Sequence, residues 1–360
     1  MAELRLGLVG AGDGAQTLAD ALGACEHVRA TAVCDPNTSS AERLAAVLGI
    51  PALETPDELL ARADVDAVVV AVPTFLTGML AQAGARAGKH VLMLPPGATG
   101  PEEALHALKA AQAAGMHLCT LLAERYAAPW RVLHEVVASG ALGDVRSLYL
   151  GVTAARDAGW WLAGSGPEGW RGRRLQAGGG VLLGEALPLL DAAAWATGLV
   201  AERVSAEHGA AVPDVEVEDL GGMLITYRGG ALGTIHVAWA APGGAGPMGE
   251  GGQRVLGTRG QAVVLRDGLW LFSADGWGDR VPPGQWTQVP TPQRAPAQAL
   301  FLDAFAQALQ AGQDPPVADE AGLEALKVIG AGYQSRRLGR AIRLDEVLQK
   351  VVMATWTTIG

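Results

Sequence analysis

The chain has 360 residues, of which 49% are hydrophobic and 18% charged, a composition typical of a globular protein with room for two domains. Its formal net charge of -10 argues against a nucleic-acid partner, because phosphate binding requires a basic surface. Three cysteines, Cys25, Cys34 and Cys119, lie in apolar segments and indicate reduced core residues. With an N-terminus that runs directly into a strand and no long uncharged apolar run, the sequence predicts a cytoplasmic protein without a membrane span.

The first third of the chain alternates short apolar runs with helical patterns. Strands are predicted at Leu4–Gly10, Val28–Cys34, Val65–Val72, His90–Leu94 and His117–Leu122. They are apolar almost throughout, as expected of parallel strands that are buried on both faces. Thr55 and Thr99, each followed closely by proline, are predicted helix caps, and Gly88 and Gly115 are predicted left-handed helix ends. The pattern predicts a doubly wound parallel sheet.

A glycine turn joins the first predicted strand to the first helix. Gly10 permits a tight turn, and Gly12 allows the backbone to approach phosphate oxygens that a Cβ atom would push away. Ala15 is small enough for close helix–strand packing, and Asp35 ends the next strand twenty residues later. This arrangement predicts a dinucleotide-binding βαβ unit. The alternative is a glycine turn in an unrelated α/β unit, in a chain with 49 glycines.

After Leu122 the pattern changes, which predicts a first domain over 1–122 and an α+β domain over 123–360. Strands with glycine-bearing turns are predicted at Val145–Ala154, Leu220–Tyr227, Ala231–Trp239, Arg254–Gly257, Gln261–Leu265 and Leu269–Ser273. Several of them alternate apolar and polar residues, which predicts an antiparallel sheet with one covered face. Helices are predicted at Pro129–Ser139, Gly180–Thr197, Ala297–Gln310 and Asp319–Leu338.

Several motifs together resemble one known family. They are the glycine turn with Asp35-Pro36, Asp66–Pro73, Ala87–Leu92, Glu124-Arg125-Tyr126 with Pro129, Gly178-Gly179-Gly180, Ala325–Ile329 and Tyr333-Gln334-Ser335. On these motifs the chain resembles the Gfo/Idh/MocA oxidoreductases along nearly its whole length. The resemblance implies a Rossmann domain followed by an open antiparallel sheet whose flat side forms homo-oligomer contacts. It also implies NAD(P)-dependent hydride transfer to or from a sugar, cyclitol or related polyol in the cleft between the domains.

The resemblance places the cofactor on the glycine turn and on the ends of the neighbouring strands. The cofactor-binding residues are then Gly10, Gly12, Asp13, Gly14, Asp35, Val72, Pro73, Thr74, Thr77 and Leu94. Asp35 favours NAD, because a carboxylate accepts ribose hydroxyls and repels the 2′-phosphate of NADP. No arginine follows Asp35 directly to reverse that preference.

The catalytic positions depart from the family pattern. Where relatives place Glu-Lys-Pro after the Gly-Lys-His-Val strand, this chain has Leu94 and then Pro95. Where relatives place an aspartate and, four residues later, a histidine, it has Gly184 and Pro188, and Thr77 replaces a further histidine. Proline cannot exchange a proton, so either the usual alcohol oxidation is lost or other residues perform it. Pro188 is also predicted to kink the helix or delay its start.

Two residues are candidate replacements for the missing proton donor. Glu185 stands beside the lost aspartate, although a carboxylate at a helix start is also explained by the helix dipole. Tyr126 could donate a proton if its pKa were lowered; the alternative is a buried tyrosine whose hydroxyl the backbone satisfies. Beside it, Arg125 is expected to border the substrate cleft.

A tryptophan- and arginine-rich segment is the predicted substrate site. Its candidate binding residues are Arg156, Trp160, Trp161, Arg171 and Arg173. Indole faces stack on sugar rings and arginine forks bind anionic groups, so a sugar or an anionic ring compound is the expected ligand. The alternative is a surface lid with solvated arginines. Because the segment belongs to the second domain, replacing Arg171 is expected to spare cofactor binding.

The histidines and cysteines suggest no further site. His90 and His117 open buried strands and are expected to be core residues, and His236 is expected on the outer face of its sheet. No cluster has metal-ligand spacing, so no metal is predicted. Two alternatives to an oxidoreductase remain open: a non-catalytic cofactor- or ligand-binding relative, and an NAD-assisted lyase, isomerase or hydrolase.

Overall fold

The computed structural model describes residues 3–156, 158–162, 169–212, 214–239, 252–266, 268–317 and 320–348. Its first sheet, sheet A, is parallel and has six strands in the order β3-β2-β1-β4-β5-β6. The strands are β1 (Leu4–Val9), β2 (Val28–Cys34), β3 (Ala52–Leu53), β4 (Ala67–Val70), β5 (His90–Met93) and β6 (Leu118–Thr120). The predicted doubly wound sheet is confirmed, and the short edge strand β3 adds to the five predicted strands.

Helices cover both faces of sheet A, as the nearly continuous burial of its strands requires. Helices α1 (Asp13–Leu22) and α2 (Thr38–Leu48) pack on one face. Helices α3 (Pro56–Leu60), α4 (Thr74–Arg86) and α5 (Pro101–Ala113) pack on the other.

The predicted helix ends of this domain are confirmed with one exception. The hydroxyl of Thr55 accepts a hydrogen bond from the backbone N–H of Glu58, and Gly88 and Gly115 are left-handed, with φ of +73° and +67°. Thr99 does not cap α5, because the N-cap residue is Gly100. Instead the backbone N–H and hydroxyl of Thr99 both donate to the carboxylate of Glu103.

The second sheet, sheet B, has nine strands in the order β14-β13-β12-β11-β7-β10-β9-β8-β15. They are β7 (Val145–Thr153), β8 (Ala201–Gly209), β9 (Leu220–Tyr227), β10 (Leu232–Ala238), β11 (Gln253–Gly257), β12 (Gly260–Leu265), β13 (Gly268–Ser273), β14 (Trp286–Pro290) and β15 (Ile342–Arg343). The sheet is mostly antiparallel, as expected, but β7 and β10 run parallel at its centre. Sequence analysis missed β8, β14 and β15.

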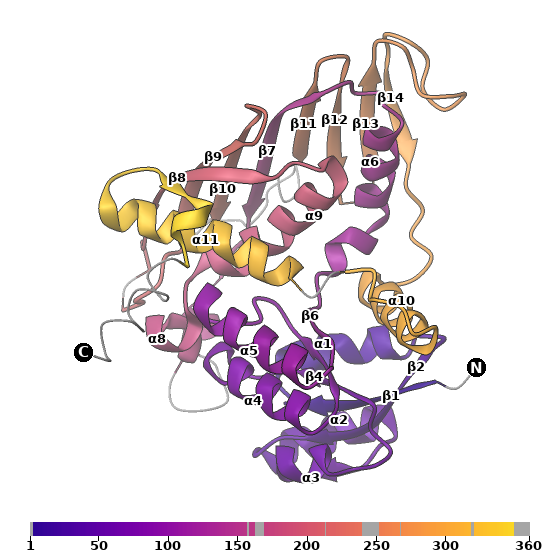
Figure 1. The fold of residues 1–360 in the computed structure, drawn as a ribbon, viewed down its shortest axis with the longest axis vertical. Helices are drawn as coiled ribbons and strands as arrows, with labels where there is room; N and C mark the ends of the chain where they lie inside the picture. The colour runs from indigo at the N-terminus through magenta and orange to yellow at the C-terminus, as the bar shows by residue number, and fades with distance from the viewer. Residues whose placement is uncertain are drawn as a thin grey trace.

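One face of sheet B is covered by helices and the other is open (Figure 1). Helices α6 (Ala128–Ala138), α9 (Leu187–Thr197) and α11 (Ala321–Leu338) pack their apolar residues on the covered face. The start predicted for the last helix, Asp319, lies outside the described residues. On the open face, exposed and buried residues alternate along β9 and β10, and His236 is exposed there, as predicted.

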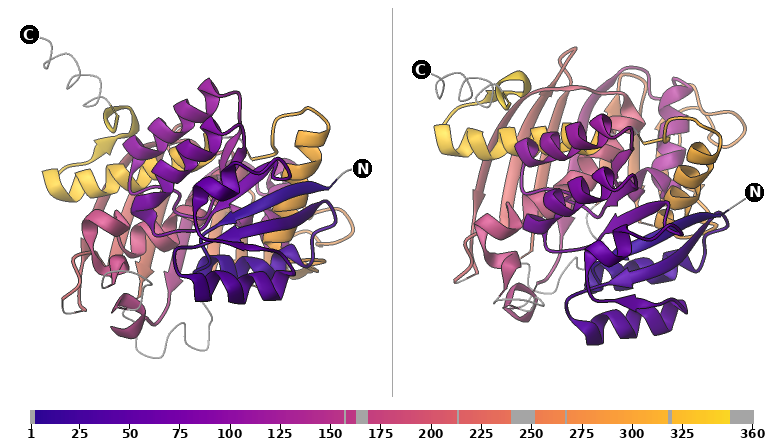
Figure 2. Two further views of the ribbon diagram at one scale, coloured as in Figure 1. Left: turned by 90° about the horizontal axis from the view of Figure 1, so that it is seen from below. Right: turned by 60° about the horizontal axis from the view of Figure 1, so that its bottom comes forward.

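Helix α10 (Ala297–Gln310) returns from the second half of the chain to the first domain. Its Phe301, Leu302 and Phe305 join the core that β1 and α1 form, and Figure 2 shows α10 beside sheet A. A single domain boundary after Leu122 therefore separates the two sheets, but it assigns α10 to the second domain although this helix packs on the first. The boundary itself stays a prediction.

One helical stretch, Arg174–Thr197, is long and apolar enough to cross a membrane by composition alone, with a mean hydropathy of 1.2. However, 67% of its apolar window is buried inside the protein. It includes the short helix α8 (Arg174–Ala177), the π-helical turn η3 (Leu182–Ala186) and α9. Such burial is typical of a core helix, since its apolar surface is already covered by protein.

Candidate active site

The glycine turn of the first domain has the shape of an anion site. Gly10 has φ of +103°, and a Cβ there would lie 2.3 Å from the carbonyl oxygen of Ala71, so only glycine fits. Gly12 is the N-cap of α1, and no side chain caps the helix there. A Cβ on Gly12 would meet no protein atom within 4 Å. Uncapped N–H groups facing open space fit the pyrophosphate of a dinucleotide.

Asp35 lies beside this turn at the end of β2. Its carboxylate accepts hydrogen bonds from the backbone N–H of Ala11 and of Asn37, each at 2.8 Å. Two backbone donors therefore fix the carboxylate next to the glycine turn. Each carboxylate oxygen keeps a further lone pair, so the group can still accept a ribose hydroxyl.

The other predicted cofactor residues differ in how far their side chains are exposed to solvent. Gly14 is exposed, and a Cβ there would lie 2.7 Å from the side chain of Leu94. Val72, Pro73 and Leu94 are half-buried, whereas the side chains of Thr74 and Thr77 are buried in the protein. The two threonines consequently have little surface to offer a ligand, and the half-buried residues have more.

Two of the positions that depart from the family pattern, Gly184 and Pro188, lie at the start of one helix of the second domain. Pro188 is the second residue of α9, and the preceding turn η3 is π-helical, so the predicted disturbance of this helix is confirmed. Gly184 lies in η3, where a Cβ would approach two ring carbons of Trp239 to 2.7 and 2.8 Å. The indole of Trp239 therefore fills the space next to residue 184, where relatives place a carboxylate.

Glu185 is anchored by the residues around it. Its Oε1 accepts a 2.7 Å hydrogen bond from Trp239 Nε1 and lies 3.4 Å from Arg156 Nη2. Arg156 follows β7 and Trp239 follows β10, and their backbones are joined by a 2.9 Å hydrogen bond. Because β7 and β10 are parallel neighbours, their carboxyl ends bring these side chains to one place.

Three indoles pack edge to face behind Glu185. The ring centroids of Trp160, Trp161 and Trp239 lie 4.8 to 5.2 Å apart. Arg156 and Arg171 both lie over the Trp160 ring, at 5.1 and 5.2 Å from its centroid. The structure therefore brings together four predicted residues, Glu185, Arg156, Trp160 and Arg171, with Trp161 in the layer beneath. We call these residues and Trp239 the tryptophan cluster.

Arg171 also contacts the first domain. Its Nη2 lies 2.9 Å from the carboxylate of Asp13, at the start of α1, and its guanidinium lies 5.1 Å from the Trp170 ring. The premise that Arg171 stands apart from the glycine turn is wrong, because the fold closes the second domain onto that turn, and the effect of replacing Arg171 on cofactor binding stays a prediction. The tryptophan cluster and the predicted cofactor site are adjacent.

Three predicted substrate residues have other roles in the structure. Trp161 is only 1% exposed, so it supports the cluster from below. Arg173 is exposed and pairs with Glu216 at 2.9 Å. Arg125 forms a two-pronged ion pair with buried Asp191 on α9, which commits its guanidinium to the protein core.

The surroundings of Tyr126 do not favour a role in proton transfer. It lies on the 3₁₀ turn η1 (Ala123–Tyr126) and packs edge to face on Phe301, with ring centroids 5.6 Å apart. Burial raises the pKa of its hydroxyl to about 12, the opposite of the lowered pKa that a catalytic acid needs. Tyr126 and Arg125 instead line a cavity of about 280 Å³ with Arg131 and Trp195.

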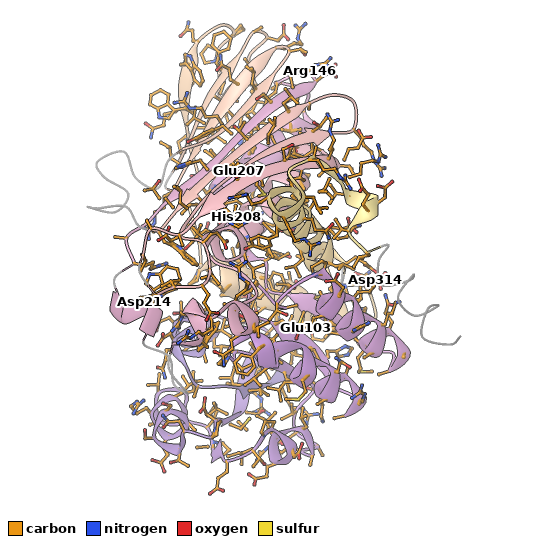
Figure 3. All side chains as sticks on the ribbon, turned by 90° about the vertical axis from the view of Figure 1, so that its left-hand side faces the viewer. Glu103, Arg146, Glu207, His208, Asp214 and Asp314 are labelled. Carbon is orange, nitrogen blue, oxygen red and sulfur yellow. The ribbon has the colours of Figure 1, made fainter. Side chains whose placement is uncertain are left out.

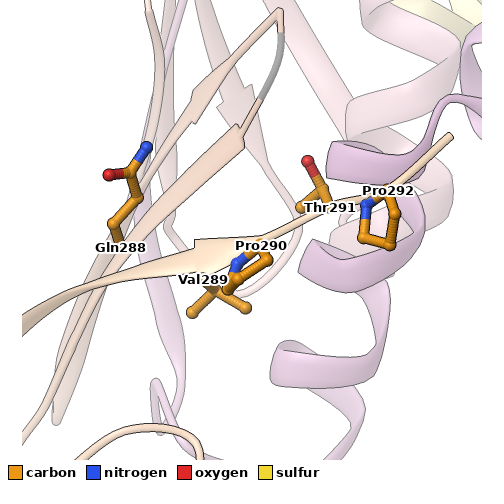
Figure 4. A pocket seen from close by; sticks show the side chains of 5 residues that line it. All are labelled: Gln288, Val289, Pro290, Thr291 and Pro292. Atoms are coloured by element: carbon orange, nitrogen blue, oxygen red, sulfur yellow. The ribbon is translucent and has the colours of Figure 1, made fainter.

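The remaining candidates are structural. His90 and His117 stack at 5.5 Å, and His90 also contacts Phe305 in α10, as expected of packed histidines. A surface hollow along Gln288–Pro292, at the edge strand β14, has no charged side chain in its lining (Figure 4). Across the described residues, no group of three or more His, Cys, Asp or Glu side chains is arranged to hold a metal.

Sequence reasoning missed Trp239 and Asp191. Trp239 is the residue after an alternating strand, where a buried aromatic is unremarkable in sequence. Asp191 stands in an apolar helix, and a lone acid in such a helix is a signal for a buried ion pair. The partner of neither residue could be identified from spacing alone.

Comparisons with known proteins identify the class of this protein. Residues 4–121 match the description "Oxidoreductase family, NAD-binding Rossmann fold", and residues 130–263 match "GFO/IDH/MocA C-terminal domain". The chain is 33% identical to 1,5-anhydro-D-fructose reductase of Ensifer adhaerens, over 66% of this chain and 69% of that protein. The chain belongs to the GFO/IDH/MocA family of oxidoreductases, as its motifs indicated.

Two further relatives extend the comparison. The dTDP-3,4-didehydro-2,6-dideoxy-alpha-D-glucose 3-reductase of Streptomyces violaceoruber is 34% identical over 40% of this chain, a segment that spans 43% of that enzyme. The solved structure of a levoglucosan dehydrogenase in complex with NADH and levoglucosan shares the fold, with a TM-score of 0.83 and 20% identity over 95% of this chain and 99% of that one. The match of residues 4–121 to an NAD-binding Rossmann fold makes the first domain a nicotinamide-cofactor domain.

Proposed function

We propose that this protein is an NAD(H)-dependent oxidoreductase that acts on a sugar, cyclitol or related polyol. The observation that supports it best is the uncapped N-terminus of α1 at Gly12, which has open space before it and Asp35 beside it. This anion site lies next to the tryptophan cluster through the Arg171–Asp13 contact. A bound cofactor and a ring-shaped substrate would therefore lie side by side.

The names of the relatives support this substrate class. The two curated relatives are named as reductases of sugar derivatives, and the solved structure is named for the anhydrosugar levoglucosan. None of the three is named for ligand binding alone or for lyase chemistry. The alternatives considered from the sequence gain no support from these names.

Asp35 is the proposed determinant of NAD over NADP. Its carboxylate is held by Ala11 and Asn37, so its negative charge stays where a 2′-phosphate would lie. Calorimetric titration with both cofactors tests this. We expect NAD(H) to bind more tightly to the wild type, and Asp35→Asn, which keeps the shape, to lose about tenfold in NAD(H) affinity and most of the preference. Equal or reversed preference in the wild type would refute the assignment.

A bound nicotinamide would supply the hydride acceptor or donor at its C4 atom. Among the residues proposed from the sequence, Glu185 is then the remaining candidate for holding the substrate proton, because Tyr126 has a raised pKa and Pro95 and Pro188 have no exchangeable proton. General acid–base assistance contributes about 10²–10⁴-fold. We therefore expect slow turnover on simple neutral sugars and inositols, and a screen of turnover rates measures it.

The open face of sheet B is the proposed contact surface of a homo-oligomer. Large apolar side chains are exposed along it: Tyr149, Leu220, Leu224, Leu232, Leu256, Trp270 and Trp286. An apolar surface of this kind is unfavourable in contact with water. Light scattering should give a mass that is a multiple of 37.0 kDa at micromolar concentration, and a clean monomer would exclude the assembly.

We further propose a cytoplasmic location. Cys25, Cys34 and Cys119 are free thiols, in keeping with a reducing compartment. Cell fractionation with an antibody against the protein tests it, and recovery from an extracytoplasmic fraction would contradict it.

A further inference from the structure

The arginine of the tryptophan cluster that faces solvent is Arg156. Its guanidinium lies 5.1 Å from the centroid of the Trp160 ring, and 37% of its side chain is exposed. Stacking on an indole holds a guanidinium in place while leaving its N–H donors directed sideways, where they can bind a further group. Arg156 is therefore a pre-positioned donor at the edge of the predicted substrate site.

The carboxylate nearest to Arg156 is already engaged elsewhere. Glu185 Oε1 accepts its shorter hydrogen bond, 2.7 Å, from Trp239 Nε1, and Arg156 reaches the same oxygen at 3.4 Å. A contact of 3.4 Å is at the outer limit of hydrogen bonding and leaves most of the guanidinium fork unused. Arg125 shows the contrast, because both prongs of its fork bind the buried carboxylate of Asp191.

A second donor in the cluster is also unsatisfied. Trp161 is buried, and its Nε1 has no hydrogen-bond partner within the described parts of the chain. A buried unpaired N–H costs about 1–3 kcal/mol, but this donor lies beneath the other indoles and has no exposed surface of its own. Arg156 is therefore the accessible donor of the cluster, and the Trp160 ring on which it lies offers an aromatic face.

We propose that the tryptophan cluster recognises a cyclic sugar acid, a pyranose ring that carries a carboxylate. The carboxylate binds the fork of Arg156, whose planar geometry matches two carboxylate oxygens, and the ring lies against the indoles. Arg171, over the same Trp160 ring, is paired with Asp13, so the recognition is assigned to Arg156. The inference rests on the proposed function and specifies it: the substrate of this site is anionic, not a neutral sugar.

Calorimetry with matched sugar pairs tests the proposal. Each pair shares one ring and differs only at C6: D-glucuronate with D-glucose, D-galacturonate with D-galactose, and D-mannuronate with D-mannose. We expect at least one uronate to bind at least about tenfold more tightly than its neutral parent. No advantage for the uronate in any pair would overturn the proposal, and so would tighter binding of glucose 6-phosphate than of every uronate.

Substitutions of Arg156 test whether this residue is the source of the preference for the uronate. Within Arg156→Gln the uronate should bind no more tightly than its neutral parent, whereas Arg156→Lys should recover part of the uronate advantage, because a lysine keeps the charge but not the fork. The matched control is Arg146→Gln. Arg146 lies near the start of β7, is exposed and pairs with Asp144, and Figure 3 shows it at the end of sheet B far from the first domain. An unchanged advantage in Arg156→Gln would overturn the proposal.

A tryptophan pair tests the ring contact. Trp160→Leu should weaken the neutral parent, which uses the indole, and should weaken the uronate at least as much, because the indole also holds Arg156; Trp270→Leu on the open face of sheet B should change neither. Circular dichroism confirms that each variant is folded. If Trp160→Leu binds both sugars as the wild type does, the cluster is not the ring site.

The outcome can be separated from that of the proposed function. NAD(H) titration and turnover test the oxidoreductase, whereas the sugar pairs test recognition by binding alone. Neutral sugars that bind and turn over, with uronates that do not bind, would leave the oxidoreductase intact and overturn this inference. Failure to bind any nicotinamide cofactor would refute the proposed function and leave the dependence of uronate binding on Arg156 as a separate result.

Discussion

Gly12, at the predicted cofactor turn, and Gly184, at a position that departs from the family's catalytic pattern, lie in opposite surroundings. A Cβ on Gly12 would meet no protein atom within 4 Å, whereas a Cβ on Gly184 would lie 2.7 Å from a ring carbon of Trp239. The first glycine leaves space for a ligand, and the second leaves space for the protein's own side chain. The predicted cofactor half of the site thus keeps open space at its glycine turn, while Trp239 fills the space at Gly184.

This difference has a physical origin. An anion site at a helix N-terminus is made by backbone N–H groups, so it persists wherever the turn and the helix persist. Proton transfer depends on individual side chains, which can be exchanged without altering the fold. Pro95 follows β5 without interrupting sheet A, and Pro188 is accommodated in the first turn of α9, after a π-helical turn. A family fold can therefore keep its cofactor while its catalytic groups change.

The largest expected effect lies at Gly12. Gly12→Ala should weaken NAD(H) binding by about 100-fold, because a methyl group would enter the space where the pyrophosphate lies. Gly12 has φ of -74° and ψ of -171°, which alanine adopts freely, so the free energy of unfolding should fall by less than about 1 kcal/mol. Calorimetry and denaturant unfolding measure the two quantities. Unaltered NAD(H) affinity would show that the cofactor does not use this turn.

Gly184→Ala should show the reverse pattern. The added methyl group must displace the Trp239 ring, which costs about 1–3 kcal/mol of unfolding free energy in a packed site, while NAD(H) affinity stays within about twofold. The double variant Gly184→Ala/Trp239→Phe, with a smaller ring, should regain part of the loss. If Gly184→Ala is as stable as the wild type, Trp239 does not fill the position of the family's aspartate.

Much of the fold could be predicted from the sequence, because buried parallel strands and the glycine turn are local patterns. The packing position of α10 could not be predicted, since the pattern of an amphipathic helix indicates that one of its faces is buried but not which sheet covers that face. The same distinction between local patterns and long-range contacts applies to the candidate site. Gly10, Gly12 and Asp35 follow from spacing within one βαβ unit, whereas the contacts Arg125–Asp191 and Arg171–Asp13 join residues far apart in the chain.

The contact between Arg171 and Asp13 predicts a third, smaller effect. Arg171→Ala should weaken NAD(H) binding by about tenfold, because it leaves the charge of Asp13 uncompensated at the helix end that faces pyrophosphate. Asp13→Asn in the same chain should restore most of the affinity, and the double-mutant cycle gives the coupling. Full NAD(H) affinity in Arg171→Ala would restore the initial view that the two sites are independent.

The smallest effect is expected at Tyr126, for which the sequence left open a proton donor and a buried structural tyrosine. The raised pKa of its hydroxyl, about 12, means that the neutral form is stabilised: this contribution to stability is complete below pH 10 and is lost as the pH rises through 12. At neutral pH the hydroxyl therefore neither gives nor takes a proton readily. Tyr126→Phe keeps the ring on Phe301, so turnover of any substrate found should change by less than about threefold, with the same pH profile. A loss of 10²-fold or more, with one limb of the pH–rate profile removed, would instead identify Tyr126 as the proton donor and release Glu185 from that role.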